Sequence, residues 1–475
     1  MIVSIDHEGA HLMTNSKDEL MIAEINRLDE KGSGQAVVWR ENEQGNKKKL
    51  QLTIKQTLPG EKVRVIVDQP ERRRRIAQLE EVIEPHTERV APLCPHFDQC
   101  GGCVWQHWQY TGQLKQKTNF VKGEIESQGF DPGLVKDTIG MGEPWHYRNK
   151  MEFTFAPDGT LGLHEQGNFR KIISLESCLI AREEMVGAAL EVATWAREHQ
   201  LTGYNKDLHE GLLRHLMVRQ SFATGEMMLA LFATEAPEAH LKEAADDLVK
   251  RISEKCSQVK SLMWLENTDW ADRTQSEKNH LLSGRDFIYD EMSGYRFRVW
   301  FDTFFQTNPT QAQKLVDLAL EMGQPKKTEK MIDLFCGVGT FSLPFASRVE
   351  KLAGIEIVES SIESAKRNAK DNGISNTIFL AKDARTGIDE ILESFGKPEL
   401  LLLDPPRSGA GGKVMRRIGR AKPERIVYVS CNPSTFATDI KELEPFGYTL
   451  KVVQPVDLFP HTVHVECVAI LVKEN

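Results

Sequence analysis

The chain of 475 residues is long enough for about three domains, and its 40% apolar and 27% charged residues are typical of a globular protein with a large core. No run approaches about 18 uninterrupted apolar residues, which excludes an apolar membrane-spanning helix, and residues 1–20 lack the features of a secretory signal. Eight dispersed cysteines are too few for a disulfide scaffold. We therefore expect a cytoplasmic protein, and we expect it to be monomeric.

The amino-terminal part predicts a leader followed by a small β-barrel. Residues 1–20 show no regular pattern, whereas residues 21–83 contain short alternating stretches at 36–39, 50–54 and 63–67, separated by glycine and Pro-Gly turns. Short strands at this spacing favour a barrel of OB-like type. Such barrels commonly bind single-stranded nucleic acid.

Charge is distributed unevenly along the chain. Residues 31–79 hold 12 Lys or Arg against 5 Asp or Glu, which leaves 48 basic and 64 acidic residues elsewhere. A basic module on an acidic body favours contact with a polyanion such as RNA or DNA. The alternative is that the basic runs at 47–49 and 72–75 are solvated turns.

A mixed α+β region is predicted over residues 90–300. It opens with three of the eight cysteines, which fall within ten residues at Cys94, Cys100 and Cys103. Helical periodicity appears at 183–199 and 238–254. Hairpin turns are predicted at Asp158-Gly159, Thr224-Gly225 and Ser293-Gly294.

Residues 301–475 have the rhythm of an α/β domain, because strand, glycine turn and helix alternate. This alternation predicts a Rossmann-like, open and mostly parallel sheet with helices on both faces. The last two strands, joined by a turn at 459–461, are expected to add an antiparallel edge. The predicted strands are 331–335, 352–357, 377–381, 400–403, 426–430, 448–456 and 465–472.

The first of these strands runs into a glycine-rich turn within 331–342, where backbone can approach a ligand. Glu356 ends the next strand and can accept both ribose hydroxyls, and Asp383 follows the third strand, where it can reach an adenine amino group. Ser342 replaces the third glycine of the dinucleotide fingerprint, which favours S-adenosylmethionine over NAD. The alternative reading makes Asp333 a turn-former and Asp383 a surface residue.

Two strand ends carry candidate catalytic residues. Residues 400–403 lead into Asp404-Pro405-Pro406-Arg407, and residues 426–430 lead into Cys431-Asn432-Pro433. Cys431 lies at the pocket edge before a helix, a setting that favours a thiolate nucleophile over a buried structural cysteine. The remaining cysteines outside the cluster are assigned to packing: Cys256, Cys336 and Cys467.

A thiolate beside a methyl donor suits methylation of uracil at C5. Addition of sulfur to C6 makes C5 nucleophilic, and the C5 proton must then be removed by a base. Glu466 is the expected base, because a carboxylate in the apolar segment 464–468 is costly to bury without a role. His461 and His464 are the alternatives.

The combination of residues 333–340, 404–407, 430–433 and 464–466 resembles the RNA uracil-5-methyltransferase family, and specifically the iron–sulfur branch that methylates 23S rRNA. The resemblance implies that Cys431 is the nucleophile and Glu466 the base. It also implies cofactor contacts at Gln306, Phe335, Thr340, Glu356, Asp383 and Asp404.

The same resemblance gives a role to the barrel and to the cysteines. The barrel is similar to the family's TRAM domain, which the tRNA-modifying branch lacks. Cys94, Cys100 and Cys103, together with Cys178, are similar to the branch's ligands for a [4Fe–4S] cluster. Zinc is the alternative metal, since four cysteines satisfy it equally well. We expect the cluster to be structural or to support RNA rather than to be redox-active.

Two other functions remain as alternatives. A nucleic-acid-binding protein with a vestigial transferase domain would have no reason to keep both Cys431 and Glu466. A cytosine-5 transferase shares the thiolate addition, but such RNA enzymes usually place a second cysteine where this chain has Asp404-Pro405-Pro406.

Overall fold

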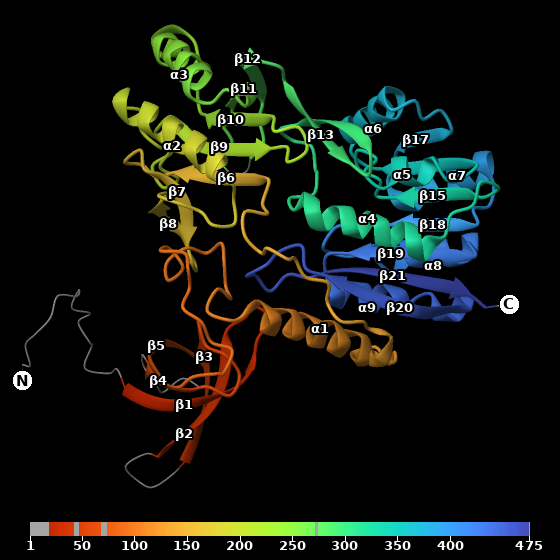
Figure 1. The fold of residues 1–475 in the computed structure, drawn as a ribbon, viewed down its shortest axis with the longest axis horizontal. Helices are drawn as coiled ribbons and strands as arrows, with labels where there is room; N and C mark the ends of the chain where they lie inside the picture. Colours follow the sequence, from red (N-terminus) through yellow and green to blue (C-terminus); the bar gives the residue numbers. More distant parts are fainter. Residues whose placement is uncertain (1–18, 42–46, 68–73, 271–273, 475) are drawn as a thin grey trace, which may run out of the picture. The chain divides into compact units, whose positions relative to one another are not determined.

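The computed structural model describes residues 19–41, 47–67, 74–270 and 274–474 (Figure 1). The contacts divide the chain into two compact units, one of residues 1–92 with 104–109 and the other of residues 93–103 with 110–475. Most of the expected leader at 1–20 lies outside the described residues. No helix in the described part of the chain is long and apolar enough to cross a membrane.

The first unit is built on a closed five-stranded barrel with strand order β1-β2-β3-β5-β4. Alternation places every second residue of β3 and β4 inside, so that Leu50, Leu52 and Ile54 are fully buried. The predicted strands at 36–39, 50–54 and 63–67 are confirmed. The strands are β1 (Glu19–Leu28), β2 (Gly34–Glu41), β3 (Lys47–Ile54), β4 (Lys62–Val67) and β5 (Arg74–Glu84).

The first helix of the second unit is α1 (Tyr110–Ser127), which is followed by the 3-10 turn η1 (Pro132–Leu134) and a seven-stranded sheet of order β12-β11-β10-β9-β6-β7-β8. Helices α2 and α3 cover this sheet, and β13 and β14 form a separate hairpin. The three predicted hairpin turns and both predicted helices are confirmed. The elements are β6 (Lys150–Phe155), β7 (Leu161–Glu165), β8 (Asn168–Ser174), α2 (Glu183–Glu198), β9 (Leu213–Gln220), β10 (Met227–Ala233), η2 (Ala239–Leu241), α3 (Lys242–Lys255), β11 (Val259–Glu266), β12 (Lys278–Gly284), β13 (Phe287–Met292) and β14 (Tyr295–Trp300).

A second seven-stranded sheet has the order β17-β16-β15-β18-β19-β21-β20. Its first five strands are parallel, and β21 runs antiparallel between β19 and β20, which confirms the predicted Rossmann-like arrangement. The elements are α4 (Pro309–Gly323), β15 (Lys330–Leu334), α5 (Ser342–Ala346), β16 (Lys351–Glu356), α6 (Glu359–Asp371), β17 (Thr377–Ala381), α7 (Ala384–Phe395), β18 (Leu400–Leu403), α8 (Gly412–Ala421), β19 (Arg425–Ser430), α9 (Pro433–Lys441), η3 (Glu444–Phe446), β20 (Tyr448–Val456) and β21 (Glu466–Lys473).

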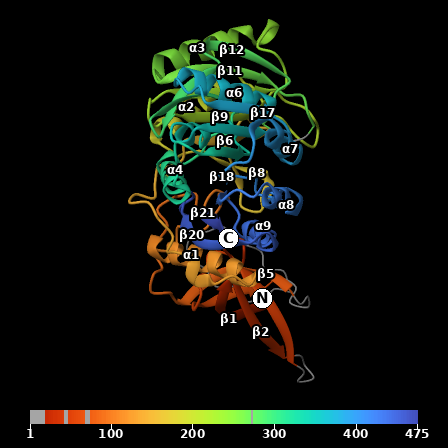
Figure 2. The ribbon, with the colours of Figure 1, turned by 90° about the vertical axis from the view of Figure 1, so that its right-hand side faces the viewer.

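Both faces of this sheet are buried. Alternate strand residues face α4, α5 and α6 on one side and α1, α7, α8 and α9 on the other, as Figure 2 shows for α4 against α8 and α9. Because the strands are covered on both faces, they read as continuous apolar runs such as Leu400–Leu403. Helix α1 reaches this sheet from far earlier in the sequence and packs along β20 and α9.

The topology brings the candidate residues to one edge. Parallel strands β15, β16, β17, β18 and β19 end there, and β21 begins there because it runs the opposite way. Ligands of open α/β sheets bind at this carboxyl edge.

Candidate active site

The glycine-rich turn after β15 is held open by left-handed backbone. Phe335, Gly337 and Gly339 have φ values of 64°, 52° and 92°. The amides of Phe335 and Cys336 both donate to the carbonyl of Ile355, at 2.8 and 3.1 Å, which ties the turn to β16. The turn borders a pocket of about 390 Å³, whose lining includes Phe335, Glu356, Ile357, Lys382, Asp383, Arg385 and residues 410–414.

The two predicted nucleoside-binding acids both line this pocket. Glu356 accepts a hydrogen bond from the amide of Val358 at 3.0 Å, and the neighbouring Ile357 side chain is 66% exposed, so it offers an apolar surface to a ring. Asp383 caps helix α7 through the amide of Arg385 at 2.9 Å and pairs with the Arg385 guanidinium at 2.8 Å. Within the part of the chain that the structure describes, its Oδ2 accepts only one bond, of 3.2 Å from Arg385 Nη2, so this carboxylate keeps capacity for a ligand amino group.

Asp333 is buried at the end of β15 and explains the serine that replaces the third glycine. Its Oδ2 accepts a hydrogen bond of 2.5 Å from Ser342 Oγ, which links the strand to α5. Burial raises the pKa of Asp333 to about 7, and the charges of Asp404 and Glu356 add to the rise. Among the described residues its Oδ1 accepts no hydrogen bond, so a donor group on a bound ligand would find an acceptor there.

Three further predicted cofactor residues lie elsewhere than the lining of this pocket, as far as the described residues show. Gln306 is buried, and its carbonyl accepts from Asn149 Nδ2 at 3.2 Å. Thr340 lies half-buried in the turn before α5. Asp404 follows β18, where its amide donates to the carbonyl of Leu334 at 3.3 Å. Its charge raises the pKa of Asp333, and burial together with the charge of Glu466 raises the pKa of Asp404 itself.

Strand pairing brings Cys431 and Glu466 together. Ser430 is the last residue of β19 and pairs with Cys467 of β21, so Cys431 and Glu466 are the next residues at that edge. Glu466 also pairs with Val456 at the end of β20. The predicted nucleophile and the predicted base therefore share the edge at which Asp404 lies. Cys256, Cys336 and Cys467 are buried, as their assignment to packing requires.

The electrostatics of this pair differ from the sequence-based expectation. Burial raises the pKa of Glu466 to about 7, whereas the charge of Arg407 acts to lower it. Burial also raises the pKa of Cys431 to about 12, and the charges of Glu466 and Asp404 add to the rise. Burial of the thiol, with the charges of Glu466 and Asp404 added, therefore acts against the thiolate that the sequence predicts at this position.

Arg407 is the cation of this cluster, and reasoning from the sequence missed its role. It is exposed, its charge lowers the pKa of Cys431 and of Glu466, and its Nη2 lies 3.2 Å from His464 Nδ1. Asn432 caps α9 by accepting from the amide of Ser434, and its Nδ2 donates to the Arg407 carbonyl at 3.0 Å. A hydrogen bond therefore links the Asp-Pro-Pro-Arg motif directly to the Cys-Asn-Pro motif.

The two histidines that compete for the role of base are poor proton acceptors. Burial lowers the pKa of each to about 4, and nearby cations, Lys117 for His461 and Arg407 for His464, add to the effect. His461 stacks on Trp145 with ring centroids 3.9 Å apart. Its ring also lies against Gln113, with Nδ1 3.2 Å from Nε2.

The cysteine segment docks on the β7–β8 hairpin. The amide of Gly101 donates to the carbonyl of His164 at 3.1 Å, and the amide of Gln166 donates to the carbonyl of Gln99 at 2.7 Å. The backbones of Cys100 and Glu165 form an isolated antiparallel β-bridge, and the segment that follows β8 contains Cys178.

Three of the four cysteines, Cys94, Cys100 and Cys178, affect one another electrostatically. Burial raises the pKa of Cys100, and the charges of Cys178 and Cys94 raise it further. The charges of Cys103 and Cys178 both act on Tyr147. Within the described ranges, no group of three or more His, Cys, Asp or Glu side chains is arranged to hold a metal ion.

Comparison with known proteins identifies the family. A sequence model of the tRNA (uracil-5-)-methyltransferase family matches residues 109–474. An uncharacterized RNA methyltransferase of Caldanaerobacter subterraneus subsp. tengcongensis is 35% identical over 469 residues, covering 96% of this chain and all of the relative. Another from Halalkalibacterium halodurans is 36% identical, covering 89% of this chain and 92% of the relative.

A solved structure has the same architecture. The tRNA (uracil-54, C5)-methyltransferase of Pyrococcus abyssi, in complex with S-adenosyl-L-homocysteine, superposes with a TM-score of 0.74 at 27% identity. The match covers 95% of this chain and 99% of that one. This chain therefore belongs to the tRNA (uracil-5-)-methyltransferase family of S-adenosylmethionine-dependent RNA methyltransferases.

Proposed function

We propose that this protein methylates C5 of a uridine in 23S rRNA, with Cys431 as nucleophile and Glu466 as base. The observation that carries the proposal is the strand register that puts these two residues side by side, next to Asp404 and near the pocket of the glycine-rich turn. S-adenosylmethionine supplies an electrophilic methyl group when it is bound.

The residues of the pocket suit that cofactor. We propose that Glu356 accepts hydrogen bonds from the ribose, that Ile357 covers the adenine, and that Asp383 reaches its amino group. Phe335, Thr340, Asp404 and Gln306 complete the set, and the unsatisfied Oδ1 of Asp333 offers a further acceptor.

In the proposed reaction the partly exposed Cys431 thiol gives its proton to solvent water, and the resulting thiolate Sγ bonds to C6 of the uracil while the C5=C6 electron pair moves toward C5. The positive charge of Arg407 favours the thiolate against the two carboxylates. C5 then bonds to the methyl group, whose former bond pair stays with the cofactor sulfur.

The product leaves by elimination. Glu466 takes the C5 proton, the C5–H electron pair re-forms the C5=C6 bond, and the C6–S bond pair returns to Cys431. A carboxylate with a pKa of about 7 is a suitable acceptor near neutral pH, since a base works best when its pKa lies close to the operating pH.

Transfer RNA is a second candidate substrate. The Pyrococcus abyssi enzyme acts on tRNA, and a match to 95% of this chain includes most of the barrel, so the barrel does not by itself separate the two substrates. We expect nucleoside mapping of RNA from cells that lack the protein to show one or more 5-methyluridines missing from 23S rRNA. Loss confined to tRNA would overturn the rRNA assignment.

We also propose that Cys94, Cys100, Cys103 and Cys178 hold a [4Fe–4S] cluster. Such a cluster needs four thiolates, one for each iron, and the chain offers four cysteines, three of them in the segment that docks on the β7–β8 hairpin. The cluster would fasten residues 94–103 to the β7–β8 hairpin, which is a structural role.

The metal proposal predicts a brown protein when purification is anaerobic. Iron analysis should give about four irons per chain, as four-thiolate ligation of this cluster requires. Changing Cys178 to Ser should remove most of the iron, whereas Cys256→Ser, which lies in the core of the central sheet, should keep it. A colourless protein with one zinc per chain would contradict the cluster.

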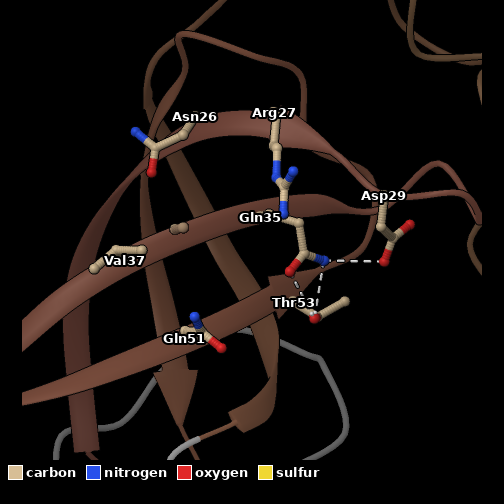
Figure 3. Close-up of a pocket in the computed structure, with 8 residues that line it drawn as sticks. Asn26, Arg27, Asp29, Gln35, Val37, Gln51 and Thr53 are labelled. Atoms are coloured by element: carbon tan, nitrogen blue, oxygen red, sulfur yellow. Dashed lines mark hydrogen bonds between the residues drawn. The ribbon is translucent and has the colours of Figure 1, made fainter. Parts of the chain in front are cut away.

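The barrel is proposed to dock RNA on the outer face of β1, β2 and β3. A groove there is lined by Asn26, Arg27, Asp29, Gln35, Ala36, Val37, Gln51 and Thr53. Figure 3 shows Gln35 bonded to Asp29 at 2.9 Å and to Thr53 at 3.0 Å. Four residues further along β2, Trp39 pairs with Lys49 of β3 and is 63% exposed. Amides, an exposed indole and lysines together suit single-stranded RNA.

Substitutions in the barrel should separate stacking from charge. Trp39→Ala should weaken RNA binding by about 1–3 kcal/mol and leave the salt dependence unchanged, since stacking releases no counterions. Lys49→Gln should reduce the slope of log K against log salt by about 0.7. The check is a salt titration, with Trp270→Ala as the control for an exposed tryptophan in the second unit. Equal affinities of the Trp39→Ala variant and the wild type would contradict docking on this face.

The arginine run at 72–75 is expected to bind phosphates as well, but Arg72 and Arg73 lie outside the described residues. Neutralising all four arginines should flatten the salt dependence further, by about 0.7–0.9 in slope for each phosphate that is no longer neutralised. An unchanged slope would make the run a solvated turn.

A further inference from the structure

The turn between β20 and β21, residues 457–465, carries His461 and His464 and leads directly into Glu466. Val456 and Glu466 form the last rung of the β20–β21 ladder, so the ladder does not restrain the turn beyond that rung. His461 adopts φ = 65°, a left-handed conformation that costs energy for a residue other than glycine. Such a residue persists only where its surroundings over-determine it.

A buried ion pair anchors the start of the turn. Lys117 Nζ of α1 lies 2.6 Å from Asp457 Oδ1, and both side chains are completely buried. The same ammonium donates to the carbonyl of Phe459 at 3.0 Å. Tyr110, also in α1, donates its hydroxyl to Asp457 Oδ2 at 2.9 Å. Both carboxylate oxygens of Asp457 are therefore bound by one helix.

The rest of the turn is held in the same way. Gln113 of α1 accepts from the amide of His461 at 2.9 Å. The carbonyls of residues 457, 458 and 460 accept from Gln311, Asn308 and Tyr147, at 2.9, 2.9 and 3.1 Å. Side chains from three separate segments thus bind four successive carbonyls, those of residues 457 to 460.

This frame adjoins the start of β21. Asp457 follows Val456, which pairs with Glu466, and Glu466 adjoins Cys431 across the β19–β21 rung. A displacement of the turn would move Glu466 relative to the C5 proton of the adduct. Misplacement by about 1 Å can cost about 10²-fold in rate.

We propose that Lys117, together with Asp457, is a positioning residue that holds Glu466 in place for removal of the C5 proton. The inference rests on the proposed role of Glu466. Helix α1 thereby belongs to the catalytic apparatus, although it lies more than 300 residues from Cys431 in sequence.

The test compares the single and the double substitution. Lys117→Met leaves a buried charge unpaired and should destabilise the fold strongly, whereas Lys117→Met with Asp457→Leu removes both charges and should restore the melting temperature. Because the bonds to the turn are still absent, the double variant should keep a kcat about 10–100-fold below wild type. Its KM for RNA and its cofactor affinity should be unchanged.

The diagnostic readout is the covalent protein–RNA adduct on a denaturing gel. Slow proton removal should make the double variant accumulate adduct on ordinary RNA, as Glu466→Gln should. Thr118→Val is the matched control, because Thr118 is the next residue of α1 and bonds to Thr138 rather than to the turn. Tyr110→Phe, which removes one bond to Asp457, should show a smaller effect in the same direction.

The outcomes separate this inference from the proposed function. Wild-type turnover in a stable double variant, with slow release in Glu466→Gln, would overturn the role of Lys117 alone. Normal turnover in Glu466→Gln would overturn the role of Glu466 and the inference with it. If the double variant does not fold, wild-type kcat in Tyr110→Phe would overturn the inference.

Discussion

Replacing Cys431 by Ala should abolish the covalent adduct and reduce turnover by at least about 10³-fold, because methylation at C5 depends on addition of the thiolate at C6. The sharpest assay uses RNA in which the target uracil carries fluorine at C5. Fluorine cannot leave as a proton, so wild-type enzyme with saturating cofactor should form a stable protein–RNA band on a denaturing gel. The band should be missing in the Cys431→Ala variant.

The control for this experiment is Cys256→Ala, which removes a buried cysteine from the central domain without touching the catalytic edge. It should retain the adduct band. Cofactor affinity should be unchanged in both variants, since Cys431 is not among the described residues that line the pocket proposed for the cofactor. Failure of the wild-type enzyme to form the band would contradict the nucleophile assignment.

Replacing Glu466 by Gln should stall the reaction after methyl transfer. General-base catalysis contributes about 10²–10⁴-fold, so kcat should fall by that factor while adduct accumulates on unmodified RNA. Single-turnover experiments should show methyl transfer to RNA that is followed by little free product. Asp290→Asn is the control, because Asp290 is another buried carboxylate with a raised pKa, of about 6, outside this edge.

The pH dependence of product release gives a second check. Because the pKa of Glu466 is raised to about 7, the carboxylate is protonated below that pH and cannot accept the C5 proton. Release by the wild-type enzyme should therefore slow as the pH falls through about 7, and the Glu466→Gln variant should lack this transition. A transition near pH 4 instead would point to His461 or His464.

The sequence predicted the strands of the carboxyl-terminal sheet well because its signals are local. These strands are largely apolar runs, so Glu356, Asp404 and Cys431 could be placed at strand ends before the register was known. The hairpins at 158–159, 224–225 and 293–294 follow from turn chemistry of the same local kind.

The misses involve pairings between segments that are distant in sequence. The buried face of α1 includes four residues spaced four apart, Gln113, Lys117, Val121 and Ile125. This face therefore contains a lysine, a residue type that would be expected on the exposed face of the helix. Its partner Asp457 is a buried acid at the end of an apolar strand, the same signal that identified Glu466. The same reasoning, applied to Asp457, would have identified it as a buried acid that needs a partner. It would not have identified α1 as the helix that provides Lys117.

The raised pKa of Cys431 was missed for a related reason. A helix start and a strand end are visible in the sequence, whereas the burial of the thiol, which is the main cause of its raised pKa, and its closeness to Glu466 and Asp404 depend on how the strands assemble.

The position of β21 has a consequence for biosynthesis. Synthesis proceeds from the amino end, so Cys431 is made 35 residues before Glu466, and β19 remains a sheet edge until β21 is inserted beside it. An edge strand with unpaired amides and carbonyls is a template for pairing with another chain. Ribosome-bound chains stalled before residue 466 should therefore be vulnerable to association through β19, and in such chains the thiol would be present without the group that releases its product. Insertion of β21 between β19 and β20 completes the sheet and places Glu466 beside Cys431. A nascent chain should therefore begin turnover only after β21 has left the exit tunnel.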